Sequence, residues 1–390
     1  MKPFYFAKRK LLLVPAAILL VALAIPTKLS GQTITTFDAP GAGTGALQGT
    51  YATNLNPSGT IIGFSRDAND VRQAFVRSQD GSFTIFDAPG AGTAAFQGTR
   101  AYAINPSGML TGFFVDSLNV FHGYVRDNQG VITVFDAPGA GTGPFQGTFP
   151  FSPLIINPNG AITGWSTDSA FVSHGFLRDR NGGFTTFDVP GAGTGVGQGT
   201  FPFAISYDGE ITGFYVDAAN ANHGFLRDKK GVITTYDVPG AGTGPGQGTF
   251  GGGLTPNGTI MGNYFDSDNL SHGFVLDKKG VFTTFDAPHA GNVPGSFPPQ
   301  GTYPFGLNTN GAITGWYVDD ANVNHGFVRD KHGALVEFDV PGAGTGPGQG
   351  PNVYSIAPNG AVTGFYLDPD NVVHGFVREA HGDALSLPKQ

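Results

Sequence analysis

Short apolar segments of about six residues, separated by glycine-, asparagine- and aspartate-rich turns, fill most of the chain. The pattern is clearest in four segments, at residues 200–206, 210–217, 223–228 and 232–237, each rich in β-branched or aromatic residues. Such segments are typical of β-strands, and turns with Asn-Gly or Asp-Gly pairs are typical of hairpins. We therefore predict four antiparallel strands over residues 200–237.

This four-strand pattern recurs along the whole chain. The motif Phe/Tyr-Asp-Ala/Val-Pro occurs seven times, at successive spacings of 49, 49, 52, 49, 49 and 53 residues. The two longer spacings contain insertions, at residues 151–155 and 289–299. The aspartates of the motif are Asp38, Asp87, Asp136, Asp188, Asp237, Asp286 and Asp339.

Seven units of about 50 residues with four antiparallel strands each predict one all-β domain, a seven-bladed β-propeller over residues 25–390. The chain begins with a fourth-type strand, Ile34–Asp38, and its last motif strand is of the third type, His374–Arg378. We expect the N-terminal strand to complete the last blade and close the ring, which would leave few strand edges exposed. An open β-solenoid is the alternative architecture, and it would not need this offset.

The units also share a second pattern, Ala-x-x-x-Asn-x-x-Gly-x-Ile-x-Gly followed by His-Gly-Phe. It is matched in part at Ala204–Gly213, followed by His223–Phe225, and at Ala103–Gly112, followed by His122–Tyr124. This pattern resembles the bacterial extracellular HAF repeat, although glycine replaces the alanine of the name-giving triplet and the first unit has Gln73 in place of histidine. The resemblance implies an exported, propeller-like repeat protein and implies no particular activity.

Composition supports an all-β chain. There are 62 glycines, 28 prolines and 34 phenylalanines among 390 residues, and only 13% of residues are charged. Glycine and proline disfavour helices, so a helical protein is excluded. The chain has no cysteine, which excludes disulfides, thiolate metal sites and a cysteine nucleophile. Its net charge of −8 argues against nucleic-acid binding.

The first 24 residues have the features of a secretory signal peptide. A basic segment (Lys2, Lys8, Arg9, Lys10) precedes an apolar segment over residues 11–25, and Ala22 and Ala24 form a small-x-small cleavage site. We predict a signal peptide over residues 1–24, and a secreted or periplasmic mature chain without a membrane span. An uncleaved N-terminal anchor is the alternative.

Strand order places two kinds of loop on the same face of the predicted disc. The loops between units carry Pro-Gly-Ala-Gly-Thr sequences, and the hairpins between the second and third strands carry Asp-x-x-x-x-x-His sequences. Long loops on a rigid scaffold often bear function, so we expect this face, here called the loop face, to bind ligands. The glycine-rich loops lack the Lys-Ser/Thr and the helix N-terminus of a phosphate-binding loop. We interpret them as spacers.

An aspartate and a histidine six residues apart recur in six units. Across a hairpin, this spacing brings the two side chains together, either to close the hairpin by a hydrogen bond or to bind a cation weakly, with Ca²⁺ as the candidate ion. Asp268, Asp370 and the inserted His289 add further polar groups to the face. The pairs are Asp116 and His122, Asp168 and His174, Asp217 and His223, Asp266 and His272, Asp319 and His325, and Asp368 and His374.

Two more repeated residues have structural interpretations. A glutamine precedes glycine at the start of each first strand, and we expect its amide to hydrogen-bond the loop backbone. An arginine ends most third strands and mostly precedes an acid, so we expect surface ion pairs.

Taken together, these features predict a monomeric exported module that binds an extracellular glycan, another surface polymer or a protein, or that is structural. No cofactor is expected apart from the candidate Ca²⁺. The alternative is a hydrolase or lyase with acids on the loop face. Against an enzyme, the acids and histidines are repeated in nearly every unit, whereas a single active site requires residues that break the repeat.

Overall fold

The computed structural model describes residues 33–380. The predicted signal peptide, residues 1–24, lies outside the described residues. Within residues 33–380 every regular element is a β-strand, and the strands number 28. The prediction of an all-β domain is therefore confirmed. The described part also contains no helix long and apolar enough to cross a membrane.

The strands pair antiparallel in groups of four, which we number as units 1 to 7 in chain order. Units 1 and 2 contain β2 (Gly49–Leu55), β3 (Ile61–Arg66), β4 (Arg72–Arg77), β5 (Phe83–Phe86), β6 (Gly98–Ile104), β7 (Leu110–Val115), β8 (Phe121–Arg126) and β9 (Ile132–Phe135). Units 3 and 4 contain β10 (Gly147–Phe149), β11 (Ile162–Thr167), β12 (Ser173–Arg178), β13 (Phe184–Phe187), β14 (Gly199–Ile205), β15 (Ile211–Val216), β16 (Asn222–Arg227) and β17 (Ile233–Tyr236).

The remaining units follow the same order. Units 5 and 6 contain β18 (Gly248–Leu254), β19 (Ile260–Phe265), β20 (Ser271–Leu276), β21 (Phe282–Phe285), β22 (Gly301–Leu307), β23 (Ile313–Val318), β24 (Asn324–Arg329) and β25 (Leu335–Phe338). Unit 7 contains β26 (Gly350–Ile356), β27 (Val362–Leu367), β28 (Val373–Arg378) and β1 (Ile34–Phe37). The strands of unit 4 match the four predicted segments to within one residue at each end.

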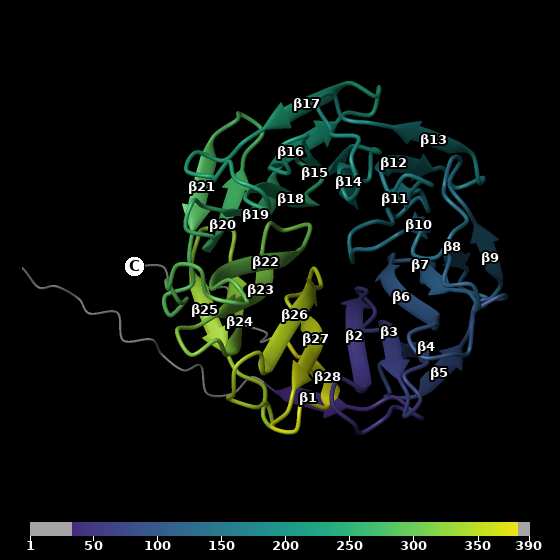
Figure 1. Ribbon diagram of the computed structural model, residues 1–390. Coiled ribbons are helices and arrows are strands. Elements are labelled where there is room, and N and C mark those ends of the chain that lie inside the picture. Colours follow the sequence, from purple (N-terminus) through teal and green to yellow (C-terminus); the bar gives the residue numbers. More distant parts are fainter. Residues whose placement is uncertain (1–32, 381–390) are drawn as a thin grey trace, which may run out of the picture. The chain divides into compact units, whose positions relative to one another are not determined.

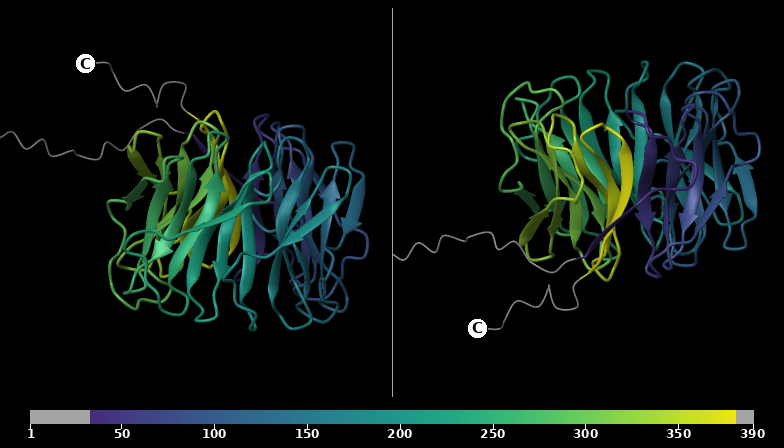
Figure 2. Two further views of the ribbon diagram at one scale, coloured as in Figure 1. Left: turned by 90° about the horizontal axis from the view of Figure 1, so that it is seen from above. Right: turned by 90° about the horizontal axis from the view of Figure 1, so that it is seen from below.

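The first of the described strands, β1, pairs with the last, β28, as predicted. Ile34 lies opposite Arg378 and Phe37 opposite Gly375 in an antiparallel register. In Figure 1 the first strand of each unit lies toward a common centre and the fourth strand lies outermost. The strands of neighbouring units stand side by side in both views of Figure 2, with loops gathered at their two ends.

Neighbouring units approach most closely at the glycine that starts each first strand. Gly199 has a φ of +117°, and a Cβ at this position would lie 2.0 Å from the backbone oxygen of Ser173 in the preceding unit. Only glycine fits such an approach without strain. The next residue, Thr200, accepts a hydrogen bond of 2.9 Å from the backbone N–H of Val189. The Gln-Gly-Thr sequence therefore joins each of units 1 to 6 to the unit before it, and unit 7 has Pro351 in place of the threonine.

The core lies within and between the units. The aromatic residue of each His-Gly-Phe sequence is fully buried, and in unit 4 it is Phe225. Phe225 packs with Ile205, Ile211 and Tyr215, and Phe187 of the preceding unit packs against this cluster. The equivalent residues, all 0% exposed, are Phe75, Tyr124, Phe176, Phe274, Phe327 and Phe376.

The predicted surface ion pairs of the repeated arginines are wrong. Arg227 is 9% exposed, and its Cζ lies 5.0 Å from the ring centroid of Phe187 in the preceding unit. Arg126, Arg178, Arg329 and Arg378 stack in the same way on the phenylalanine that precedes the motif aspartate. The arginine points inward because a guanidinium can cover an aromatic ring while its stem fills the gap between units.

Candidate functional site

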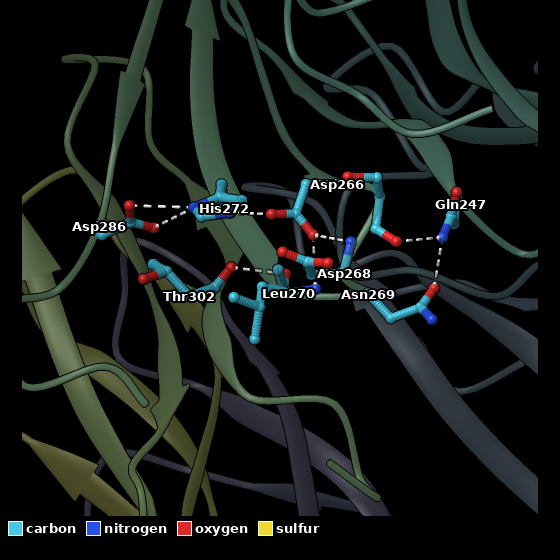
Figure 3. A network of polar contacts seen from close by, with 10 residues as sticks. Gln247, Asp266, Asp268, Asn269, Leu270, His272, Asp286 and Thr302 are labelled. Atoms are coloured by element: carbon cyan, nitrogen blue, oxygen red, sulfur yellow. Dashed lines mark hydrogen bonds and ion pairs between the residues drawn. The ribbon is translucent and has the colours of Figure 1, made fainter. Parts of the chain in front are cut away.

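Each of the six histidines of the predicted Asp and His pairs lies between two carboxylates on the loop face. In unit 5, His272 on β20 has its Nδ1 3.0 Å from the Asp286 carboxylate and its Nε2 3.3 Å from Asp266 Oδ2 (Figure 3). Asp266 follows β19 and Asp286 follows β21. Three consecutive strands therefore contribute one residue each.

The aspartate six residues before the histidine closes the hairpin. Asp266 Oδ1 accepts hydrogen bonds of 2.9 Å from the backbone N–H groups of Asp268 and Leu270. Asn269 between them has a φ of +62°, a conformation that asparagine tolerates better than most residues. The carboxylate satisfies the turn backbone with one oxygen and faces the imidazole with the other, as the hairpin-closure interpretation requires.

The same geometry recurs in all six units with a histidine. The distance from the histidine Nε2 to the nearer oxygen of the aspartate six residues before it is 3.3–3.5 Å in each of these units. These are the predicted pairs Asp116–His122, Asp168–His174, Asp217–His223, Asp266–His272, Asp319–His325 and Asp368–His374. The histidines' Nδ1 atoms lie closer, at 2.7–3.0 Å, to Asp136, Asp188, Asp237, Asp286, Asp339 and Asp38. In unit 1, Gln73 donates a 2.9 Å hydrogen bond to Asp87 instead.

Sequence reasoning missed the closer partner, the aspartate of the Phe/Tyr-Asp motif. It lies 14 residues after its histidine in five units, and this constant spacing was the available signal. In the last unit the partner is Asp38, 336 residues away in the chain.

The other predicted site residues do not join these groups. His289 Nδ1 lies 2.6 Å from Glu337 on the outermost strand of unit 6, and the imidazole is 65% exposed. Asp268 and Asp370 donate their backbone N–H groups to Asp266 and Asp368. Within residues 33–380, no three His, Asp or Glu side chains are grouped so as to hold a metal ion.

We expect the histidines to make stability depend on pH. Hydrogen bonds to Asp136, Asp286 and Asp339 raise the pKa of His122, His272 and His325 above the ordinary value of about 6.5, against the effect of burial. Their folded-state pKa exceeds the unfolded one, so their stabilisation is fully present below about pH 6.5 and is lost as the pH rises through the folded-state pKa. The melting temperature should therefore fall above pH 6.5, as thermal unfolding across that range can measure.

The control for this pH effect is the glutamine that unit 1 already uses. His122→Gln, His272→Gln and His325→Gln together should keep the bonds to aspartate and make the pH dependence less steep, because His174, whose pKa is also raised, against the effect of burial, by its aspartate partners, remains. His332→Gln, in an exposed turn, should leave it unchanged. An equally steep dependence in the triple variant would contradict the assignment.

The repeated glutamines connect the two kinds of loop, which confirms that both emerge on one face. Gln198 Oε1 accepts the backbone N–H of Gly195 in its own loop, and its Nε2 donates to Asn220 Oδ1 in the next hairpin at 3.0 Å. The predicted role of the glutamine amide in satisfying loop backbone is also confirmed.

A belt of aromatic rings, the aromatic belt, runs through the first and second strands of all seven units. Successive ring centroids are 4.7–6.1 Å apart. The belt contains Tyr51, Phe64, Tyr102, Phe113, Phe149, Trp165, Phe203, Phe214, Phe250, Phe265, Tyr303, Trp316, Tyr354 and Phe365.

In unit 5, two positions beside this belt carry no aromatic ring, and a cavity of about 260 Å³ lies there. Gly252 occupies the place of Phe203 in unit 4 and Phe305 in unit 6, and Asn263 occupies the place of Phe214. We call this cavity the unit 5 pocket. Its lining is Ser152, Phe203, Phe214, Phe250, Gly251, Gly252, Asn263, Phe265, Tyr303, Pro304, Phe305 and Trp316.

The insertion in unit 3 bounds this pocket. Ser152 contributes to the lining, and Leu154 packs with the cluster of Met261 and Leu307 from units 5 and 6. The backbone oxygen of Pro153 accepts a hydrogen bond from Asn54 of unit 1. The insertion therefore contacts units 1, 5 and 6. Sequence reasoning noted the insertion but missed the pocket. Its signal was the Gly251-Gly252-Gly253 run, since the position of Gly252 is aromatic in units 2, 3, 4, 6 and 7.

No known protein family and no curated protein matches the sequence. A mutant of puromycin hydrolase has a TM-score of 0.50 and 14% identity, over 83% of this chain and 52% of that chain, so this chain spans about half of that protein. A lectin from Burkholderia pseudomallei has a TM-score of 0.47 and 11% identity, over 85% and 97%. At these identities the likeness concerns the fold alone, a β-propeller of repeated four-stranded units.

Proposed function

We propose that the protein is an exported binding module for an extracellular polysaccharide, and that the unit 5 pocket holds a sugar ring. The observation that supports this most directly is the replacement of two belt aromatics by Gly252 and Asn263. A binding site in a repeat protein must break the repeat, and in unit 5 the absence of these two rings leaves a cavity beside the aromatic belt.

The chemistry of the pocket suits a ring with one apolar face and polar edges. Its walls are aromatic, and ligand sites are commonly apolar with a few placed polar groups. Asn263 Nδ2 donates to Ser271 Oγ at 3.1 Å, which leaves the amide oxygen available as an acceptor. Ser152 supplies a hydroxyl at the same cavity.

The finer architecture belongs to the same proposal. The seven units and the pairing of β1 with β28 support a closed seven-bladed propeller. The repeat pattern supports membership of the HAF-type repeats, and the N-terminal sequence supports export to the periplasm or beyond. We treat the predicted Ca²⁺ as absent from the function, because one oxygen of each hairpin aspartate already binds two backbone N–H groups.

A hydrolase or lyase is a weaker candidate. The acids and histidines that could transfer protons lie in six equivalent groups, and each histidine is held between two carboxylates. None of these groups adjoins the unit 5 pocket, whose lining contains no ionisable acid or histidine.

Tryptophan fluorescence offers a direct test. The chain has two tryptophans, and Trp316 lines the pocket. In a Trp165→Phe background, which restores the residue type of units 1, 2, 4 and 7, Trp316 is the only reporter. We expect at least one neutral oligosaccharide, from a panel built on glucose, xylose, mannose or galactose, to shift its emission in a saturable way.

The matched variant is Gly252→Phe. A Cβ on Gly252 would meet no atom closer than 3.5 Å, so the side chain can enter the cavity and rebuild the pattern of units 4 and 6. We expect this variant to keep its melting temperature and to lose the saccharide response by at least about tenfold in affinity, because a filled cavity excludes the ligand. A response that persists in Gly252→Phe, or no response to any saccharide, would refute the proposal.

A further inference from the structure

Three arginines gather at the boundary between units 1 and 2 on the loop face, where every other unit has uncharged residues. The position of Arg72 is filled elsewhere by Phe121, Ser173, Asn222, Ser271, Asn324 and Val373. Arg66 and Arg100 are likewise the only charged residues at their positions among the seven units. A cationic group of this size is exceptional in a chain with a net charge of −8.

The three guanidinium groups surround one aromatic residue. The Cζ atoms of Arg66 and Arg72 lie 4.8 and 5.4 Å from the ring centroid of Phe96, and Arg100 Nη2 donates to the Phe96 backbone oxygen at 3.4 Å. We call Arg66, Arg72, Phe96 and Arg100 the arginine patch.

The patch contains one compensating acid for three positive charges. Asp70 Oδ1 lies 2.9 Å from Arg66 Nε. Within residues 33–380, neither Arg72 nor Arg100 forms an ion pair, and Arg72 Nη1 and Arg100 Nε are buried without a hydrogen-bond acceptor. Burial, together with the charges of Arg100 and Arg66, lowers the pKa of Arg72 to about 10. Arg72 and Arg100 therefore carry positive charges that no carboxylate of the described residues balances, and an anion bound at the patch would balance them.

The loop that carries Phe96 in the arginine patch also has a strained backbone. Phe96 has a φ of +68° and is 56% exposed, although the equivalent Gly197, Gly246 and Gly348 adopt this conformation without a side chain. Leu47 and Phe145, in the equivalent loops on either side, also have positive φ and are exposed. Three successive loops thus present large apolar side chains to solvent in a conformation that favours glycine, and such strain concentrates at functional sites.

We propose that the arginine patch binds the carboxylate groups of an acidic polysaccharide, with Phe96 and its neighbours Leu47 and Phe145 against the sugar rings. An exposed apolar side chain beside unpaired guanidinium groups matches a sugar ring that carries a carboxylate, and three adjacent loops suit a chain-like ligand. The proposal rests on the proposed polysaccharide-binding function, but it uses a site separate from the unit 5 pocket.

Binding of polygalacturonate to the full mature chain tests the proposal, with the fully methyl-esterified polymer and polyglutamate as comparisons. We expect polygalacturonate to bind at low ionic strength and to be released by salt, because exposed charges are screened. The uncharged ester and polyglutamate should bind at least about tenfold more weakly. Equal binding of the ester would exclude the arginines, and equal binding of polyglutamate would exclude a saccharide.

Two variants locate the site. Arg72→Gln with Arg100→Gln should weaken polygalacturonate binding at least about tenfold. Phe96→Gly should weaken it about fivefold and keep the melting temperature, because glycine relieves the positive φ. Lys229→Gln with Lys230→Gln removes two positive charges from a turn at the opposite strand ends and should leave binding unchanged. Unchanged binding in both patch variants would overturn the proposal.

The two proposals fail separately. Loss of the Trp316 response to neutral oligosaccharides with polygalacturonate binding intact would refute the pocket alone. The reverse result would refute the arginine patch alone. Each outcome therefore refers to one site.

Discussion

Replacing Phe225 by alanine should destabilise the protein by about 3–5 kcal/mol, a large part of the stability of an ordinary domain. Phe225 is 0% exposed and packs with Val189, Ile205, Ile211 and Tyr215. The ring of Phe187, in the preceding unit, lies edge-on at 6.1 Å. The substitution would leave a cavity at the junction of two units, where strands on both sides are held by backbone hydrogen bonds and cannot collapse to fill it. Urea denaturation of the mature chain measures the loss.

Phe145→Ala is the matched control for Phe225→Ala. Phe145 is 66% exposed and contributes little to the core, so its truncation should change the free energy of unfolding by less than about 0.5 kcal/mol. Similar losses in the two variants would show that Phe225 does not occupy the core as described. Because every unit has an equivalent buried ring, a second cost of similar size is expected for Phe327→Ala.

Much of the fold follows from the sequence because the repeat imposes the same constraints seven times. The strands of unit 4 are found within one residue of their predicted ends, since glycine and asparagine at the turns leave little freedom in register. The pairing of Ile34 with Arg378 could be predicted because the chain starts and stops within one unit.

The site was harder to predict, for two physical reasons. First, a side chain's partner can lie on another strand: His272 is closer to Asp286, 14 residues away, than to Asp266, six residues away. Second, the candidate binding site in this repeat protein depends on a side chain that one unit lacks. The pocket exists because Gly252 lacks a ring, and the loss of a side chain is inconspicuous in a sequence with 62 glycines.

The arginines illustrate the same limit. Arg227 precedes an acid in the sequence, which suggested an ion pair, but its guanidinium covers the Phe187 ring of the neighbouring unit. Arg72 also lies over an aromatic ring, that of Phe96, but it starts its strand on the loop face, where two further arginines lie close to it. Identical residue types therefore differ in role according to the strand end that they occupy.

Deletion of residues 34–38 should be the most damaging change to the whole architecture. It removes β1, which pairs with β28 over four residues, and the Asp38 carboxylate 2.9 Å from His374 Nδ1. It also removes the Phe37 ring, which lies 4.7 Å from Arg77 Cζ and 6.0 Å from the Phe83 ring. Loss of one partly buried aromatic side chain and several hydrogen bonds should cost about 5 kcal/mol.

The deletion should also have a consequence that a core substitution lacks. Without β1, the outer edge of β28 exposes unpaired backbone N–H and C=O groups, and such edges pair with other chains. We therefore expect aggregation, seen as light scattering at temperatures where the Phe225→Ala variant is still clear. Thr35→Ala keeps the backbone pairing and should behave like the natural chain, because Thr35 is exposed. If the deleted chain stays monomeric and as stable as the natural one, unit 7 does not need its fourth strand, and the closed ring proposed here is wrong.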